Sequence, residues 1–276
     1  MEGNELSPDN TNYRVTIVKF GERSTHKSDV YLNHHIYGQP DDPIRMDYFF
    51  WVVQNAERTI VVDTGFSKHG GESRNRTFVI DPARAYAALG VDPDTAPDVV
   101  VTHAHYDHIG NLDLFPKSRY VIAQREYDFW TGPLATRKQF HWSVEDDEIA
   151  VLATAHTQGR VHTWSASLEL APGITLLEVG GHTPGQAILL VPTDEGTVLL
   201  TSDAVHFYEE LDADMPFAFV ADLPAMYTGF DTITDLVSAG RVAHVVPGHD
   251  PSTLSRFTAV TEGELAGLAA TIGSLS

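Results

Sequence analysis

The stretch His103-Ala104-His105-Tyr106-Asp107-His108 contains three imidazoles and one carboxylate within six residues. Imidazole nitrogen and carboxylate oxygen are the ligands that Zn²⁺ and similar divalent metals prefer. The residues just before it, Asp98 to Thr102, are rich in valine and predict a buried strand that ends at the cluster. A surface loop that is rich in histidine by chance is the alternative, but the density of ligands favours a metal site.

Three further predicted strands end in a histidine or an aspartate beside small residues. His182 lies in Gly180-Gly181-His182-Thr183-Pro184-Gly185, after the apolar run 174–179. Asp203 follows the run 197–200, and His249 follows the run 242–246. Because strand ends are rigid places from which loops present functional groups, these repeated patterns predict one shared site.

Together these motifs resemble those of the metallo-β-lactamase superfamily: H-x-H-x-D-H, a lone His in G-H-T-P-G, an Asp, and a C-terminal G-H. The resemblance covers about residues 48 to 251. It implies an α/β fold, namely a four-layer αβ/βα sandwich in which two mixed β-sheets are flanked by helices. It also implies two metal ions bound at the edges of the sheets.

The resemblance implies seven ligands, three for each metal and one shared. The first metal would be bound by His103, His105 and His182. The second would be bound by Asp107, His108 and His249, and Asp203 would bridge the two. Asp63, in the run 61–65, would lie behind the ligands, where a carboxylate orients a ligand imidazole and makes it more basic.

The chemistry expected of such a site is hydrolysis. Two metals can share one bridging water and lower its pKa towards 7, so that hydroxide is available to attack a carbonyl at neutral pH. Asp107 could also carry the proton from this water to the leaving group. Tyr208 and His206 lie shortly after Asp203 and could donate a hydrogen bond to the developing oxyanion. An alternative for Tyr208 is simple packing.

Length and composition favour one domain. The chain has 276 residues, of which 42% are hydrophobic, and no linker divides it, so we expect a single domain over residues 1–276. Residues 1–12 are polar and predict a loose tail. Residues 125–165 are an aromatic-rich insert between the ligand motifs, and they could form a lid over the metals or merely pack onto the sandwich.

The net charge and the absence of cysteine argue against several classes of protein and of metal site. The formal net charge is −20, with only 18 Lys and Arg, which argues against a nucleic-acid partner because phosphates need basic patches. The absence of cysteine excludes thiolate ligands and fits a cytoplasmic protein. No segment predicts a signal peptide or a membrane anchor. A homodimer is favoured only by the base rate for soluble enzymes.

Hydrophobic periodicity gives a coarse assignment of the remaining elements. Strands are expected at 13–20, 47–53, 58–62, 97–102, 119–123, 187–191, 197–200 and 241–246. Helices are expected from Asp81 to Gly90, from Glu126 to Trp130, over 223–239 and over 262–272. Residues 131–165 are the least regular part of the chain. Eight other histidines lack the strand-end context and are expected to be ordinary surface or packed residues: His26, His34, His35, His69, His141, His156, His162 and His244.

The best match within the superfamily is the N-acyl-homoserine lactonase group, because H-x-H-x-D-H is followed by Gly110-Asn111 and Asp203 by Ala204. We therefore expect a small-molecule lactone as substrate and two divalent metals, with Zn²⁺ as the default and Fe, Mn or Co as alternatives. A lactonase for another catabolic ring, a glyoxalase II-like thioesterase and a small phosphodiesterase remain open. A metal-dependent binding protein without turnover is a further alternative from a different class.

Overall fold

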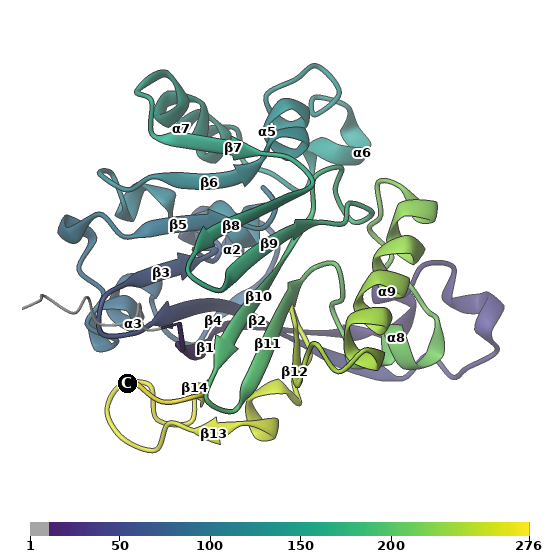
Figure 1. Cartoon of the computed structure of the whole chain (residues 1–276). Helices are drawn as coiled ribbons and strands as arrows, with labels where there is room; N and C mark the ends of the chain where they lie inside the picture. Colours follow the sequence, from purple (N-terminus) through teal and green to yellow (C-terminus); the bar gives the residue numbers. More distant parts are fainter. Residues whose placement is uncertain (1–10, 276) are drawn as a thin grey trace, which may run out of the picture.

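Two mixed β-sheets form the centre of the molecule (Figure 1), as seen in a computed structural model that describes residues 11–275. The first sheet has nine strands within these residues, in the order β13-β14-β1-β2-β3-β5-β6-β7, with β4 paired to β1. Its strands are β1 (Arg14–His26), β2 (Pro43–Gln54), β3 (Thr59–Val62), β4 (Thr77–Phe78), β5 (Asp98–Val101), β6 (Tyr120–Ala123), β7 (Val161–Trp164), β13 (Thr258–Ala259) and β14 (Ala269–Ile272).

The second sheet has five strands within the described residues, in the order β12-β11-β10-β9-β8. They are β8 (Ser167–Ala171), β9 (Ile174–Glu178), β10 (Ala187–Thr193), β11 (Gly196–Ser202) and β12 (His244–Pro247). The strands β10 and β11 form an antiparallel hairpin, with Thr193 opposite Gly196. The strand β12 pairs with β11 in parallel, so both of these strands end on the same side of the sheet.

Helices cover the outer face of each sheet. They are α1 (Lys27–Val30), α2 (Lys68–Ser73), α3 (Pro82–Ala88), α4 (Tyr106–Ile109), α5 (Gln124–Trp130), α6 (Lys138–His141), α7 (Asp146–Thr157), α8 (Tyr208–Ala213) and α9 (Leu223–Ser238). The longest, α9, begins at its N-cap Asp222 and buries Met226, Phe230 and Ile233 against the second sheet.

Three buried clusters hold the layers together. One lies between the sheets and combines residues from both, such as Trp51 and Val62 with Leu189 and Leu200. The other two lie under the helices on the outer faces. The order of layers is helix, sheet, sheet, helix, so the predicted four-layer αβ/βα sandwich is confirmed. Within the described residues, no helix is both long and apolar enough to cross a bilayer.

The prediction of a helix over residues 262–272 is wrong. The segment forms a turn and then β14, which pairs antiparallel with β1 through Val15 opposite Ile272. Gly263 and Gly267 both adopt positive φ angles, which an α-helix does not allow, and the open edge of β1 offers better burial to the last apolar residues. Tertiary pairing thus overrides the local helical spacing.

The insert also differs from its predicted structure, and most of the predicted tail lies outside the described residues. Residues 131–165 are more regular than predicted, because they contain α6, α7 and β7. The helix α7 begins with the exposed residues Asp146 and Asp147, whose negative charges stabilise a helix N-terminus. Residues 1–10 of the predicted tail 1–12 lie outside the described residues.

Candidate metal centre

The loop after β5 and the short helix behind it carry the histidine-rich cluster of residues 103–108. His103 and His105 lie in this loop, and Asp107 and His108 lie in the short helix α4 that follows it. All four side chains are buried. The valine-rich strand β5 fixes where this loop begins, because its residues are buried between β3 and β6. The first four predicted ligands are therefore held on the rigid core of the first sheet.

The second sheet brings the other ligands to the same place. His182 follows β9, Asp203 follows β11, and His249 follows β12, and all three are buried. His182 Nε2 lies 3.0 Å from His105 Nδ1, although the two residues are 77 positions apart in sequence. His103 Nε2 lies 3.0 Å from the same His105 Nδ1. Three imidazole nitrogens thus converge in the geometry predicted for the first metal.

Asp203 lies at the centre of the second group. Its Oδ1 is 3.3 Å from His108 Nε2, and its Oδ2 is 3.2 Å from His249 Nε2 and 3.5 Å from His182 Nε2. Asp107 faces the same volume, with Oδ2 3.8 Å from His249 Nε2. Since one carboxylate reaches histidines of both groups, Asp203 is placed where a bridging ligand would be.

The donor atoms fit a pair of divalent metals. Ligand atoms within 4.8 Å of one another form the groups His103–His105–His182 and Asp107–His108–His249, and Asp203 joins further groups. Nitrogens 2.0–2.1 Å from a tetrahedral metal would be about 3.3 Å apart, close to the 3.0 Å separations of these imidazoles. His108 Nε2 and Asp203 Oδ1 are buried without a hydrogen-bond partner among residues 11–275, as expected of atoms that bind a metal.

The electrostatics of the histidines suit ligands. Burial lowers the pKa of His103, His105 and His182 well below the usual range, so these imidazoles are neutral, the form that binds a metal. Burial would also lower the pKa of His108, but the carboxylates of Asp203 and Asp63 outweigh it and raise this pKa well above the usual range. A metal must therefore displace a proton from His108.

Asp63 occupies the position implied for it, behind His108. Its Oδ2 accepts hydrogen bonds from His108 Nδ1 at 2.7 Å and from Thr102 Oγ1 at 2.7 Å, and its Oδ1 accepts one from the Thr102 backbone N–H at 2.9 Å. The residue is fully buried and has a φ of +59°. Asp63 thus fixes the ring of His108 with Nε2 turned toward the donor cluster.

A second supporting carboxylate, Glu126, was missed by the sequence analysis. It is fully buried at the start of α5. Its Oε1 accepts hydrogen bonds from the Ala104 N–H and from Trp130 Nε1, and its Oε2 accepts one from the Gly185 N–H. Glu126 therefore ties the H-x-H loop to the G-H-T-P-G loop. The only sequence signal was an acidic residue three positions after the end of a buried strand.

The structure separates the two residues proposed as oxyanion donors. His206 Nε2 lies 3.0 Å from Asp203 Oδ2, and its ring stacks on Phe217 at 3.6 Å between centroids. Its Nδ1 lies 3.3 Å from Glu210 Oε1. Burial would lower the pKa of His206, but Asp203 and Glu210 raise it to about 9. His206 also belongs to a ligand group with His182 and Asp203, so it lies in the centre itself.

Tyr208 does not join the centre. Its hydroxyl donates to the Val245 carbonyl at 3.0 Å, and the guanidinium of Arg256 lies 3.6 Å from the centre of its ring. Asp250 accepts from the Tyr208 backbone N–H rather than orienting His249. Tyr208 begins α8, whose start turns this side chain toward β12. The structure therefore corrects the expectation that Tyr208 stabilises an oxyanion.

A small pocket of about 50 Å³ opens onto the ligands. Its lining residues come from both sheets and from the insert: Arg23, Met46, Tyr48, Arg76, His105, Tyr106, Asp107, Trp142, Ser143, His182, Asp203, His206, Phe217, Phe219 and His249. Trp142, from the insert 125–165, is half exposed and packs edge-on against Phe219 at 5.0 Å. Trp164, by contrast, is buried between the sheets. The insert thus covers one side of the pocket, and closure as a lid stays a prediction.

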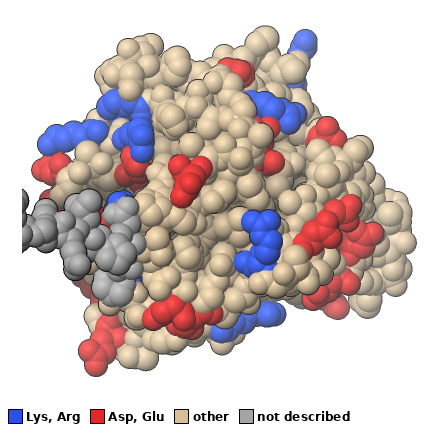
Figure 2. Space-filling model, in the orientation of Figure 1, with Lys and Arg blue, Asp and Glu red and all other residues tan. Residues whose placement is uncertain are grey.

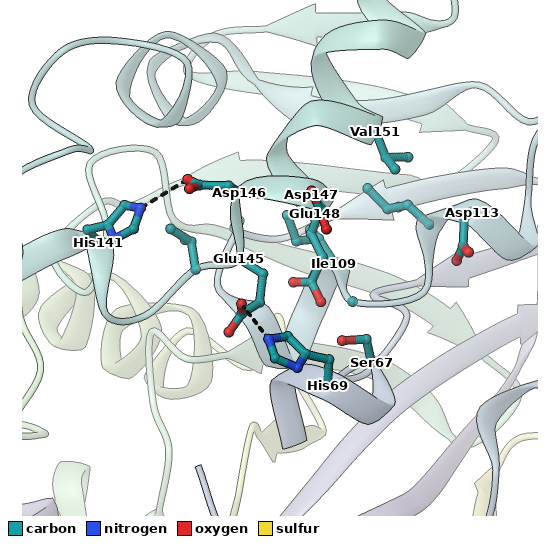
Figure 3. Close-up of a pocket in the computed structure, with 13 residues that line it drawn as sticks. Ser67, His69, Ile109, Asp113, His141, Glu145, Asp146, Asp147, Glu148 and Val151 are labelled. Atoms are coloured by element: carbon teal, nitrogen blue, oxygen red, sulfur yellow. Dashed lines mark hydrogen bonds and ion pairs between the residues drawn. The ribbon is translucent and has the colours of Figure 1, made fainter. Parts of the chain in front are cut away.

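A larger cavity of about 510 Å³ lies beside α7 and contains none of the predicted ligands (Figure 3). His69 and Glu145 face each other there at 3.5 Å, and His141 bonds to Asp146 at 2.9 Å. These two histidines were expected to be ordinary. Among residues 11–275 the groups of three or more close ligand atoms all lie in the centre described above and none lies in this cavity.

One face of the molecule shows how the charged residues are distributed. On the face drawn in Figure 2, Lys and Arg alternate with Asp and Glu and form no continuous basic surface.

Comparison with known proteins identifies the family. A profile of the metallo-beta-lactamase superfamily matches residues 47–254. The chain belongs to the metallo-beta-lactamase superfamily. The matched range contains all seven predicted ligands, and the chain is accordingly a hydrolase of this superfamily with a buried His/Asp metal-binding cluster.

Similar proteins within the superfamily include lactonases. An N-acyl homoserine lactonase of Bacillus thuringiensis is 25% identical over 227 residues, covering 77% of this chain and 81% of the relative. N-acyl homoserine lactonase AiiB of Agrobacterium fabrum is 35% identical over 120 residues, covering 43% and 44%. The solved structure of a quorum-quenching N-acyl homoserine lactone hydrolase superposes with a TM-score of 0.76 at 20% identity, covering 92% of this chain and 99% of that one. The structure of AidC, a dizinc quorum-quenching lactonase, superposes with a TM-score of 0.70 at 18% identity, covering 87% of this chain and 88% of that one.

Proposed function

We propose that this protein is a two-metal lactonase that hydrolyses the ester of a lactone ring, with N-acyl homoserine lactones and related lactones as the substrate class. The observation that carries the proposal is the convergence of two ligand groups on one carboxylate, Asp203, beside an open pocket. The similarity of the chain to curated N-acyl homoserine lactonases supports a lactone, rather than another ester, as the substrate. Zinc is the metal that this histidine-rich donor set favours.

The proposed roles of the chain's residues follow from their positions. His103, His105 and His182 would hold one metal, Asp107, His108 and His249 the other, and Asp203 both. When bound, the metals would polarise the lactone carbonyl and lower the pKa of a water molecule. The phenyl and indole groups of Phe217, Phe219 and Trp142 form an apolar wall that would limit the access of bulk water to the carbonyl.

The overall reaction adds one water to the ring. A bond forms between the water oxygen and the carbonyl carbon, the ring C–O bond breaks, and the leaving alkoxide takes up a proton. We infer that a carboxylate oxygen of Asp107 carries that proton, which is supported by its position in the pocket lining and by its distance of 3.8 Å from His249 Nε2. His206, stacked on Phe217 in the same pocket, would donate a hydrogen bond to the carbonyl oxygen as it gains charge.

Proton release by the zinc-loaded protein tests the proposal. A panel of N-acyl homoserine lactones with short and long acyl chains, γ-butyrolactone and an aromatic lactone would be assayed alongside Asp203→Ala. The exposed Asp212→Ala on α8 is the matched control. Acid release by the wild-type protein and Asp212→Ala, lost in Asp203→Ala, is the expected result. Absence of acid release from every lactone, with two metals bound, contradicts the proposal and directs the search to thioesters and phosphodiesters.

The proton-carrying role of Asp107 has its own test. Asp107→Asn should lower turnover by about 10²- to 10⁴-fold per bound metal. Metal content measured by elemental analysis in the same samples separates loss of the proton carrier from loss of the metal. Equal turnover per bound metal contradicts this role.

A further inference from the structure

Two arginines line the pocket that holds the candidate metal ligands. Arg23, from β1, and Arg76, from the turn before β4, share this pocket with Asp107 and Asp203. The chain carries a formal net charge of −20, so its overall field repels anions. Two guanidinium groups nevertheless place positive charge beside the candidate metal ligands.

Arg76 is held in place by neutral partners, and the charge of Asp107 acts on it from beyond ion-pair distance. Its Nε donates to the hydroxyl of Tyr106 at 2.9 Å, and its Nη1 donates to the Arg74 carbonyl. The guanidinium carbon lies 5.8 Å from the centre of the Tyr48 ring. Its Nη2 has no hydrogen-bond or ion-pair partner in the part of the chain that the structure describes. Contacts with the tyrosines therefore explain the orientation of Arg76, and they leave Nη2 as a donor without a partner among the described residues.

Arg23 is similarly unpaired. Its Nη2 donates to Thr25 Oγ1 at 3.1 Å, a neutral partner. Within residues 11–275 no carboxylate lies at ion-pair distance from either arginine, whereas the nearby Arg45 and Arg74 pair with Asp47 and Glu145. In a chain with 38 Asp and Glu, carboxylates were available to neutralise both groups.

The surroundings strengthen the interaction of an anion with these groups. Tyr48 and Tyr106 are buried beside them, and Met46 and Trp142 complete the apolar part of the wall. Charge-assisted hydrogen bonds are stronger where bulk water is excluded, and the planar guanidinium fork matches the two oxygens of a carboxylate.

We propose that Arg23 and Arg76 bind a carboxylate substituent of the substrate, so that the preferred lactones are anionic rather than neutral. This inference rests on the proposed lactonase function and narrows its substrate class. It predicts that the carboxylate is recognised away from the ester, at the wall formed by Tyr48 and Tyr106, while the ester carbonyl faces the metal ligands.

A matched pair of substrates tests the inference. 5-Oxotetrahydrofuran-2-carboxylate and its carboxamide have the same lactone ring and differ in one charge. The zinc-loaded wild-type protein should hydrolyse the carboxylate with the higher kcat/KM. Arg23→Gln and Arg76→Gln should lower kcat/KM by about 10- to 100-fold for the carboxylate and little for the carboxamide. Arg119→Gln, which alters a surface arginine paired with Asp98, is the control.

A binding measurement keeps the test independent of turnover. Calorimetry with 2-hydroxyglutarate, the ring-opened dicarboxylate, and with 4-hydroxybutyrate, which lacks the second carboxylate, should show tighter binding of the dicarboxylate and its loss in both variants. Failure of the wild-type protein to hydrolyse either lactone contradicts the proposed function, and calorimetry then decides the inference. Equal losses on both lactones, or equal binding of both acids, overturn it.

Discussion

Asp63 joins the core of the first sheet to the candidate metal centre through a single hydrogen bond to His108. Asp63→Asn removes the negative charge behind this imidazole and makes it a weaker base. We expect metal affinity to fall by about 10- to 100-fold, measured by competition with a chromogenic chelator. Asp98→Asn, at the surface pair with Arg119, should leave the affinity unchanged. An unchanged affinity in Asp63→Asn would refute this role.

Glu126 acts on backbone rather than on ligands. Glu126→Ala leaves the Ala104 N–H, the Gly185 N–H and Trp130 Nε1 without their acceptor. Each buried donor left unpaired costs about 1–3 kcal/mol, so the free energy of unfolding should fall by several kcal/mol in urea titrations. Glu126→Gln keeps one acceptor oxygen, so its free energy of unfolding should lie between those of Glu126→Ala and the wild-type protein. If Glu126→Ala is as stable as the wild-type protein, the loops are held together by other contacts.

The ligands were predictable at this scale and Glu126 was not. His103, His105, Asp107 and His108 are crowded into one stretch, so their chemistry is visible without knowledge of the fold. The partners of Glu126 include backbone N–H groups 22 and 59 positions away, and backbone groups leave no mark in a sequence. Tyr208 was misjudged for a related reason: spacing from Asp203 does not reveal where a helix start turns a side chain.

At the scale of elements, α7 carries a buried acid at its first turn. Burial raises the pKa of Glu148 from 4.5 to about 8. Between these pH values the folded protein keeps a proton that the unfolded chain has lost, so the stability falls as the pH rises through this window. Glu148→Gln cannot ionise. We expect it to be more stable than the wild-type protein at pH 8.5, with a difference that shrinks toward pH 5.

Urea unfolding of the metal-free proteins at pH 5, 6.5 and 8.5 measures this effect. Asp147→Asn is the control, because Asp147 is an exposed acid in the same turn and should show no such trend. A pH-independent difference between Glu148→Gln and the wild-type protein would mean that Glu148 is ionised throughout.

Elements with strong local signals were predicted and those that depend on pairing were not. The helix α3 begins at the N-cap Asp81 with Pro82 in its first turn, as the residues indicate. The segment 262–272 has apolar spacing that suits a helix, yet its neighbour in space is the edge of β1. The residues of the segment alone do not indicate that it will pair with this edge.

At the scale of the whole molecule, the candidate centre links two halves of the chain. Four predicted ligands follow β5 in the first sheet and three follow strands of the second. Metal binding should therefore stabilise the folded state as a unit. At a free metal concentration 100 times Kd, each bound ion adds about 2.7 kcal/mol to the free energy of unfolding.

Thermal unfolding after chelator treatment and after zinc is restored measures this gain. Asp203→Ala, which removes the carboxylate shared by the two ligand groups, should gain much less from zinc. The same Tm with and without metal would show that the ligands bind no ion in the folded state.

The fold as a whole could be predicted from its ligand motifs, because those motifs accompany a specific architecture. The order of strands in the first sheet could not be read from the residues. Strands β3, β5, β6 and β7 follow one another in sequence and in space, but β14 and β13 return from beyond residue 250 to lie beside β1.

The pairing of β14 with β1 has a consequence for synthesis. A ribosome makes β1 first. The strand β4 pairs with Gly21 and Glu22, but the part of the edge from Val15 to Val18 stays unpaired until β14 has emerged. An open apolar edge is a template for pairing with other chains, and such surfaces make nascent proteins prone to aggregation. His249, the last of the predicted ligands, emerges earlier than β14. Emergence of β14 from the ribosome, rather than emergence of the last ligand, therefore closes this edge of the nascent chain.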